Sequence, residues 1–347
     1  MTFPTPSLGS VPRRDGAEDE RALADLARRL RSLRDGDLAV VEAVSLGAPA
    51  IAVLREVLFE RDVSGIFEPR RRAVQALAAL GAYDVLREFV ASWEAVADPV
   101  QRMGDEAALG AAARALGAAR DEEAFQVLFD AVRRHAVAGV IEALGEYRRV
   151  EVIPILADAL EDDLNRAAAQ DGLRKLGQDA LPAVVEIALR AVIGPSGCET
   201  CSGMRQRRSA LALLLELGVN ADAWDRLRGL VDDADDEVAA LACRIGMAAA
   251  DDAGKRVCAQ RLIRLLSRAA WFSYAEIEDC LSANLTFANE AVDRALRDLP
   301  DDGGDDAARS RLKRSLQKIK VKVSATRAQE LAPDTWGGAA GGQRPPT

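Results

Sequence analysis

The sequence has little of what catalytic and metal-binding sites usually require. It contains one histidine, His135, so a two-histidine metal motif is excluded and a histidine-based triad could be built only around this residue. His135 follows two arginines in a stretch typical of a turn, where we expect it to be exposed. A phosphate-binding loop is missing too, because Gly254-Lys255-Arg256 lacks the upstream glycine and the following Ser or Thr. We therefore do not expect an enzyme.

Aromatic residues are also scarce, at 4% of the chain, whereas hydrophobic residues reach 49%. The core must therefore be built mainly from Ala, Leu and Val. Ala and Leu are the strongest helix formers, and the runs of Val, Ile and Thr that are typical of strands are almost absent. The composition predicts an all-α fold.

No apolar run is long enough to cross a membrane. The longest, residues 39–54, is interrupted by Glu42 and Pro49 and is shorter than a bilayer requires. Residues 1–16 contain three prolines and no apolar core of signal-peptide length, and five cysteines in 347 residues do not form a disulfide framework. We expect a cytoplasmic protein that does not contact a membrane.

Acidic residues outnumber basic ones, and the net charge is −9. Nucleic acids and membrane surfaces attract proteins with a positive field, so nucleic acid is an unlikely partner for the chain as a whole. Charge can nevertheless be segregated locally. Two basic clusters stand out, residues 70–72 and the group Arg205, Arg207 and Arg208.

What the sequence does contain is a Leu-Gly pair that recurs at the end of alanine-rich helical patterns. The pairs are Leu46-Gly47, Leu80-Gly81, Leu116-Gly117, Leu144-Gly145, Leu176-Gly177 and Leu217-Gly218, with a weaker copy at Ile245-Gly246. Successive glycines are 28 to 41 residues apart, a period typical of stacked helix pairs. Each glycine suits the left-handed conformation that closes a helix.

Residues 227–246 show the unit most clearly, because an apolar helix, an acidic turn and a second helix follow one another. Carboxylates in the turn, such as Asp235, would satisfy free N–H groups at the start of the second helix. The pattern resembles the HEAT repeat in its bacterial PBS-lyase HEAT-like form, over roughly residues 38–300. The resemblance implies a right-handed α-solenoid of about eight helix pairs with helical caps, whose second helices line a concave groove.

Five segments are predicted along the chain. They are a disordered arm (1–16), a capping helix (17–37), the repeat solenoid (38–300), an acidic loop with a basic helix (301–324) and a disordered tail (325–347). The second helices are expected near 68–80, 104–117, 136–145, 163–176, 204–217, 235–249, 274–284 and 305–318. Ser273 and Glu276 have the spacing of a capping box for the helix at 274.

Both basic clusters begin second helices, where cations oppose the helix dipole and need compensation. One interpretation is pairing with the acidic turns of neighbouring repeats. The other is an anionic partner in the groove, and it predicts a set of partner-binding residues. This set is Arg71, Arg72, Arg205, Arg207 and Arg208.

The longest spacing, between Gly177 and Gly218, contains an insertion at residues 193–203 with Cys198 and Cys201 in a C-x-x-C arrangement. Two thiolates at this spacing can share a metal ion, but zinc takes four ligands and no second C-x-x-C exists. Cys243 of the next repeat could approach the loop. The alternatives are a surface loop with free or reversibly oxidised thiols, and a redox switch. We expect no cofactor other than a possible zinc ion at this pair.

These features predict a non-catalytic scaffold or adaptor that binds a protein partner through its groove. One alternative is nucleic-acid binding through the arginine clusters and the basic helix. Another is an accessory role in an enzyme, since some proteins with PBS-lyase-like repeats assist bilin attachment and some HEAT-like proteins act on alkylated DNA bases. The sequence does not predict which protein is the partner.

Overall fold

The computed structural model describes residues 16–266, 271–298 and 312–321. Within these ranges every regular element is helical, apart from one isolated bridge between Ile193 and Glu199. The predicted all-α class is confirmed for this part of the chain. The disorder predicted at both ends, and the acidic loop, lie outside the described residues. Residues 312–321 are helical, as expected for the basic helix.

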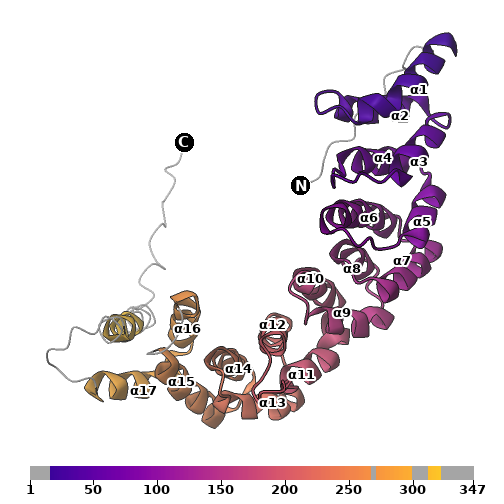
Figure 1. The fold of residues 1–347 in the computed structure, drawn as a ribbon. Helices are drawn as coiled ribbons and strands as arrows, with labels where there is room; N and C mark the ends of the chain where they lie inside the picture. The colour runs from indigo at the N-terminus through magenta and orange to yellow at the C-terminus, as the bar shows by residue number, and fades with distance from the viewer. Residues whose placement is uncertain (1–15, 267–270, 299–311, 322–347) are drawn as a thin grey trace, which may run out of the picture. The chain divides into compact units, whose positions relative to one another are not determined.

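The chain forms two compact units, Met1–Ala183 and Val184–Thr347, and the boundary falls inside α11 (Leu181–Leu189). In the first unit the helices alternate between two layers (Figure 1). The even layer contains α2 (Gly36–Leu46), α4 (Glu68–Ala79), α6 (Pro99–Ala119), α8 (Ala138–Gly145) and α10 (Arg166–Leu176). The odd layer contains α1 (Gly16–Leu30), α3 (Ala50–Phe59), α5 (Tyr83–Ser92), α7 (Glu122–Arg134) and α9 (Ile153–Ala159), with the 3-10 turns η1 (Val150–Val152) and η2 (Gly177–Ala180).

Each even helix of this unit packs on the next even helix and on its own odd partner. In the second unit α12 (Cys201–Leu217), α14 (Asp236–Ala249) and α16 (Trp271–Ala283) follow one another in the same way. The odd helices of this unit are α13 (Ala221–Leu227) with the 3-10 turn η3 (Arg228–Asp232), which pack on α14, then α15 (Asp252–Leu266), which packs on α14 and α16, and α17 (Leu285–Asp298), which packs on α15 and α16. This is the stacking of an α-solenoid, as predicted. The right-handed sense and the total of about eight pairs stay predictions.

The acidic turn before α14 has the role that the sequence predicted. Asp235 is the N-cap of α14, and its side chain accepts hydrogen bonds from the backbone N–H groups of Glu237 and Val238. Asp98 caps α6 of the even layer in the same manner, and Asp121 likewise caps α7 of the odd layer. Near residue 273 the prediction is wrong. Helix α16 already begins at Trp271, so Ser273 lies within its first turn and not at its N-cap.

The recurrent glycines have two different structural roles. Gly47, Gly81, Gly177 and Gly218 have positive φ angles of 70°, 71°, 64° and 77° at helix ends, as predicted. For Gly117 and Gly145 the prediction is wrong, because neither has a positive φ. A Cβ at Gly145 would lie 2.8 Å from the Cα of Gly172, so this glycine is needed where α8 and α10 approach closely.

Candidate functional site

The three arginines of the first basic cluster lie in different environments. Arg72 is buried, and its guanidinium donates to the carboxylate of Asp37 (3.0 Å) and to two backbone carbonyls before α2. Arg70 is also buried and pairs with Asp105, which belongs to the next repeat, and burial lowers the pKa of Arg70. Arg71 keeps 34% of its side chain exposed and pairs with Glu68 on its own helix. Only Arg71 is therefore available at the surface.

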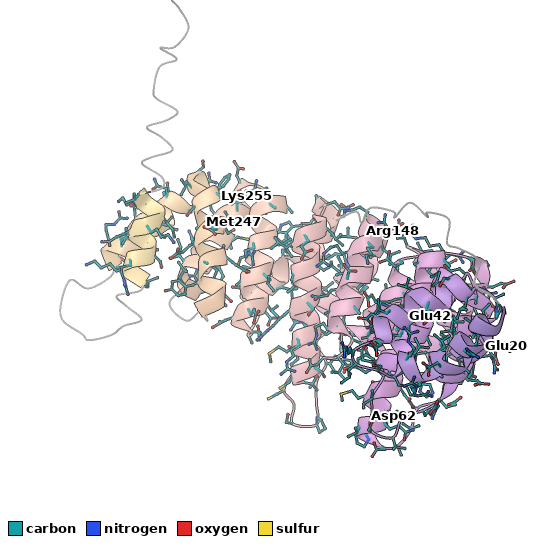
Figure 2. All side chains as sticks on the ribbon, turned by 90° about the horizontal axis from the view of Figure 1, so that it is seen from above. Glu20, Glu42, Asp62, Arg148, Met247 and Lys255 are labelled. Atoms are coloured by element: carbon teal, nitrogen blue, oxygen red, sulfur yellow. The ribbon has the colours of Figure 1, made fainter. Side chains whose placement is uncertain are left out.

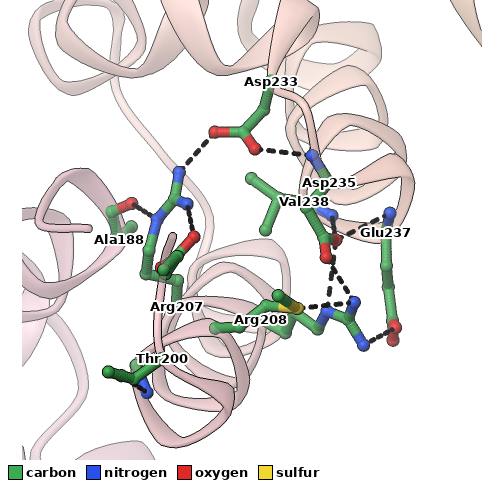
Figure 3. Close-up of polar contacts among 11 residues, drawn as sticks. Ala188, Thr200, Arg207, Arg208, Asp233, Asp235, Glu237 and Val238 are labelled. Atoms are coloured by element: carbon green, nitrogen blue, oxygen red, sulfur yellow. Dashed lines mark hydrogen bonds and ion pairs between the residues drawn. The ribbon is translucent and has the colours of Figure 1, made fainter. Parts of the chain in front are cut away.

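The second cluster is divided in the same way (Figure 3). Arg207 keeps only 4% of its side chain exposed and pairs with Glu199 (2.8 Å) and Asp233 (2.5 Å). Burial alone would lower the pKa of Arg207, but the hydrogen bond and charge of Asp233, with those of Glu199, outweigh it and raise the pKa. Arg208 is one-third exposed and pairs with Asp235 and Glu237.

For some of these arginines, the contacts decide between the two interpretations, which were pairing with a neighbouring repeat and binding of an anionic partner. Arg72, Arg207 and Arg208 pair with carboxylates of neighbouring repeats. Arg72 and Arg207 are also too buried to contact a partner protein. The sequence interpretation is therefore wrong for Arg72 and Arg207, because both side chains are buried and cannot contact a partner protein. For Arg71, Arg205 and Arg208, which keep exposed surface, that role stays a prediction.

Ion pairs of this kind join one repeat to the next along both layers. In the first unit Arg114 of α6 pairs with Glu142 of α8, and Arg55 of α3 pairs with Glu88 of α5. In the second unit Arg244 of α14 pairs with Glu276 of α16. These pairs compensate much of the positive charge, so the arginine clusters do not form a broadly basic surface.

The Cys198–Cys201 loop is ordered by its own backbone. Gly194 N donates to Cys198 O (2.8 Å), and Thr200 N donates to Val192 O (2.8 Å). Both thiols are exposed and free, and Thr200 caps the start of α12. No group of three or more His, Cys, Asp or Glu side chains placed to hold a metal is found among the described residues. The loop therefore offers two cysteine side chains, and zinc binding there stays a prediction.

The other cysteines and the histidine lie elsewhere. Cys243 and Cys258 are buried between α14 and α15, and Cys280 on α16 is half-buried, so they behave as the small core residues that were expected. His135 ends α7, where its ring packs edge-on against Trp93 with a centroid distance of 5.1 Å. Its Nε2 lies 3.4 Å from Glu94 Oε2. It is partly buried and not simply an exposed turn residue.

A groove of about 500 Å³ opens on the even layer of the first unit, between α6, α8 and the turn before α10. Gly110 and Gly139 line it where the two helices cross. A Cβ at Gly139 would lie 2.4 Å from the Cα of Gly110, so the helices touch through their backbones and leave a hollow beside them. Met103 and Leu164 form its apolar walls and are 68% and 83% exposed.

The turn before α10 fixes one wall of this groove. Asn165 is buried and its Nδ2 donates to Ala136 O (3.0 Å) and to Asp162 Oδ2 (2.7 Å). The other oxygen of Asp162 accepts from Leu164 N (2.9 Å), which holds the Leu164 side chain out in solvent. Glu106, Asp162 and Arg114 are the charged lining residues. The lining contains no thiol, hydroxyl or imidazole.

A second, smaller groove of about 370 Å³ lies on the even layer of the second unit, between α12, α14 and α16. Ala212, Leu241 and Ile277 are among its apolar lining residues. The Arg208–Glu237 and Arg244–Glu276 pairs border it. The charges at this groove are therefore compensated within the protein.

The sequence predicted a groove lined by second helices and assigned binding to the arginines, of which Arg208 lines the second groove, but it did not indicate the other lining residues. One usable signal was present, because Gly110 lies inside a helical pattern and not at its Leu-Gly end. An isolated glycine within a helix often marks a close packing contact. The sequence did not indicate that Leu164 is exposed, because its exposure depends on the turn formed by Asp162 and Asn165.

No protein-family model matches the chain, and no curated protein matches it. Among solved structures it is similar to human deoxyhypusine hydroxylase in complex with glycerol, with 18% identity over 79% of this chain and 98% of that chain and a TM-score of 0.29. It is also similar to the complex of CpcE and CpcF of phycocyanin lyase from Nostoc sp., with 19% identity over 82% of this chain, 100% of that chain and a TM-score of 0.30. Values this low support no argument about activity.

None of the described helices has the length and apolar character that crossing a membrane requires.

Proposed function

We propose that this protein is a non-catalytic scaffold or adaptor without a resident cofactor, and that it binds a partner protein along the even layer. The observation that carries the proposal is the groove between α6, α8 and α10 in the first unit. Its small lining residues leave room, and exposed Met103 and Leu164 offer apolar contacts. Concave, partly apolar surfaces with a few polar groups are where proteins most often bind other molecules.

The position of Gly110 and Gly139 supports this proposal. Glycine within a helix costs about 0.5–1 kcal/mol relative to alanine. Here that cost is offset by a close α6–α8 contact, in which a Cβ on Gly139 would lie 2.4 Å from the Cα of Gly110. The resulting hollow is a fixed part of the repeat stack. A fixed groove loses little conformational entropy when a partner binds.

Blocking the groove tests the proposal. Ala107 lines it and is only partly buried, so Ala107→Trp would fill the groove without entering the core. Ala118 is exposed on the same helix and does not line the groove, which makes Ala118→Trp the matched control. Tagged full-length protein and both variants would be used to capture partners from the native cell, with identification by mass spectrometry.

We expect a specific protein to be captured by the unchanged chain and by Ala118→Trp, and to be lost with Ala107→Trp. Equal capture by all three would refute binding in this groove. If the chain instead retained nucleic acid with a steep salt dependence, the scaffold proposal would fail in favour of nucleic-acid binding. Release of a chemically altered small molecule by the complex would favour an accessory role in an enzyme.

A further inference from the structure

Large apolar side chains gather beside the groove of the first unit. Five are more than half exposed, with exposed fractions between 51% and 83%. They are Val63, Ile66, Val100, Met103 and Leu164. Two belong to the loop at residues 60–67, two to the first turns of α6, and one to the turn before α10. We call this set the apolar edge.

The apolar edge is one connected surface. The loop at residues 60–67 lies directly on the start of α6, since a Cβ at Gly65 would be 2.5 Å from Val100 O and a Cβ at Gly104 would be 2.3 Å from Gly65 O. Met103 and Leu164 then both line the same groove. In Figure 2 the label of Asp62 marks this loop where it projects from the first unit.

The exposure of these side chains is held in place by hydrogen bonds. Asp62 Oδ1 accepts from Ser64 N (2.8 Å) and from Ser64 Oγ (2.5 Å), which fixes the loop turn and lowers the pKa of Asp62. Arg61 donates to Glu94 O (2.9 Å) at the base of the same loop. Leaving apolar surface in water costs about 25 cal/mol per Å². Contiguous patches of this kind mark interaction sites.

The charge around the apolar edge is negative. Asp62, Asp98, Glu106 and Asp162 border it, and no ion pair joins any of them to a cation within the described ranges. The nearby arginines are already engaged, because Arg61 pairs with Asp105, Arg166 with Asp163 and Arg114 with Glu142. Arg102 on α6 is exposed, and it is the one neighbouring cation for which the described residues give no ion pair. Carboxylates therefore dominate this border.

We propose that the apolar edge binds a basic amphipathic segment of the partner protein. The apolar face of that segment would cover Val63, Met103 and Leu164, and its lysines or arginines would lie over the four carboxylates. Complementary charge of this kind fixes orientation and speeds association. The inference rests on the proposed scaffold function and adds the chemistry of the partner.

Other occupants fit this surface less well. In a symmetric dimer the same patch meets its own copy, which would bring the acidic borders together. Nucleic acid and anionic lipid carry the same sign of charge as the border. The basic helix at residues 312–321 is already packed within its own unit, with Leu316 and Ile319 buried and Lys318 paired with Glu278. A separate basic segment is the occupant that the charges favour.

The test uses a fluorescein-labelled synthetic helical peptide of leucine and lysine, with all lysines on one face, and the full-length protein. Fluorescence anisotropy would give the dissociation constant at low and at physiological salt. Two comparison peptides have glutamate in place of lysine, or the same composition in scrambled order. We expect the basic amphipathic peptide to bind at least about tenfold more tightly than either, because both the charge and the apolar face are needed.

Two double variants locate the binding site. Met103→Ser with Leu164→Ser removes apolar contacts from the edge. Glu106→Gln with Asp98→Asn removes two of the four charges, and the remaining oxygen of residue 98 can still accept from Gln101 N at the start of α6. We expect each to weaken binding about tenfold, and the second also to reduce the salt dependence. The controls lie in the second unit. Val257→Ser alters an exposed apolar residue and is the control for the apolar variant, and Asp252→Asn with Glu290→Gln removes two exposed charges and is the control for the charge variant. Both controls should change the dissociation constant less than twofold.

Three results would overturn the inference. They are tight binding of the glutamate peptide, equal losses in the control variants, and a dimer in light scattering that the Met103→Ser, Leu164→Ser variant dissolves. All the altered side chains are exposed or partly exposed, and circular dichroism would verify that each variant is folded. Failure here is distinct from failure of the scaffold proposal. A captured partner that Ala107→Trp excludes but that has no basic segment would leave the scaffold standing and remove this inference.

Discussion

The guanidinium of Arg207 on α12 lies 2.5 Å from the carboxylate of Asp233, which belongs to the turn before α14. The same side chain donates to Ala188 O (3.1 Å) at the end of α11 and to Glu199 (2.8 Å) in the loop before α12. One arginine therefore joins three consecutive segments of the second unit. Because α12 begins at Cys201, Arg207 lies in its second turn and not at the N-terminus that the sequence predicted, and the loop before α12 and the turn before α14 supply its counter-charges.

Arg207→Ala is expected to lower the free energy of unfolding by about 3 kcal/mol, because it leaves the carboxylates of Glu199 and Asp233, which are 14% and 16% exposed, without their cation. Arg208→Ala removes a one-third exposed pair and should cost about 1 kcal/mol. Arg71→Ala, which breaks a pair within one helix, should change stability by less than about 0.5 kcal/mol. Urea denaturation of the full chain, followed by circular dichroism, measures all three. An equal loss in Arg71→Ala and Arg207→Ala would contradict this ranking.

The close α6–α8 contact predicts that Gly139→Ala destabilises the first unit. The new Cβ would lie 2.4 Å from the Cα of Gly110, and overpacking of this kind costs about 1–3 kcal/mol. Gly229 is the control, because a Cβ there meets nothing within 4 Å and its φ is not positive. Gly229→Ala should be neutral or slightly stabilising. Thermal unfolding would measure both, and an unchanged midpoint for Gly139→Ala would mean that α6 and α8 are less tightly packed than described.

How far the sequence predicts the structure depends on the range of the interaction. Helix ends follow from local chemistry, so the Asp235 cap and the positive φ of Gly47 are both foreseen. Gly117 has the same Leu-Gly pattern but lies inside α6, where a Cβ would be 3.1 Å from Ala143 on the next even helix. Only the packing of two helices, which local sequence does not encode, separates these two cases.

The candidate site shows the same limit. Arg71 and Arg72 are adjacent and chemically identical, yet one is exposed and the other is buried over Gly36 with Asp37 as its partner. A run of arginines gives no indication of which member turns inward. The apolar edge combines side chains that are about 100 positions apart in the sequence, from Val63 to Leu164, and they become a surface only when the repeats stack.

Tyr147 gives a pH-dependent prediction. Its hydroxyl donates to Leu116 O (3.3 Å), and burial, followed by the charge of Asp121, raises its pKa from 10.0 to about 12. Above pH 10.0 the Tyr147 hydroxyl therefore keeps its proton in the folded state but loses it in the unfolded state. The contribution of Tyr147 to stability is complete below the unfolded value and is lost as pH rises from 10.0 to about 12.

Spectrophotometric titration of tyrosinate in the folded protein should show one tyrosine with this late transition. Tyr147→Phe should remove that transition and flatten the decline of stability over the same pH range. If the variant kept the late transition, the raised pKa would belong to another tyrosine.

The five cysteines should separate into two classes towards iodoacetamide at neutral pH. Cys198 and Cys201 are exposed and should be alkylated quickly. Cys243 and Cys258 are buried, and the hydrogen bond to Cys258 together with burial raises the pKa of Cys243. Burial also raises the pKa of Cys280 to about 11, so Cys243 and Cys280 should react slowly, since the thiolate is the reactive form. The hydrogen bond with Cys243 lowers the pKa of Cys258, but this thiol should also react slowly because it is buried beyond the reach of the reagent. Mass spectrometry of digested protein measures the rate at each site.

The same experiment separates the alternatives for the Cys198–Cys201 loop, because each state of the two thiols protects them differently. Free thiols react at once, a disulfide reacts only after reduction, and a bound metal ion delays the reaction until a chelator is added. Denatured protein, in which all five cysteines react, is the reference for complete labelling. Fast labelling of Cys243 or Cys258 in the folded chain would contradict the packing of α14 on α15. Protection of Cys198 and Cys201 that neither a reductant nor a chelator relieves would contradict their exposure.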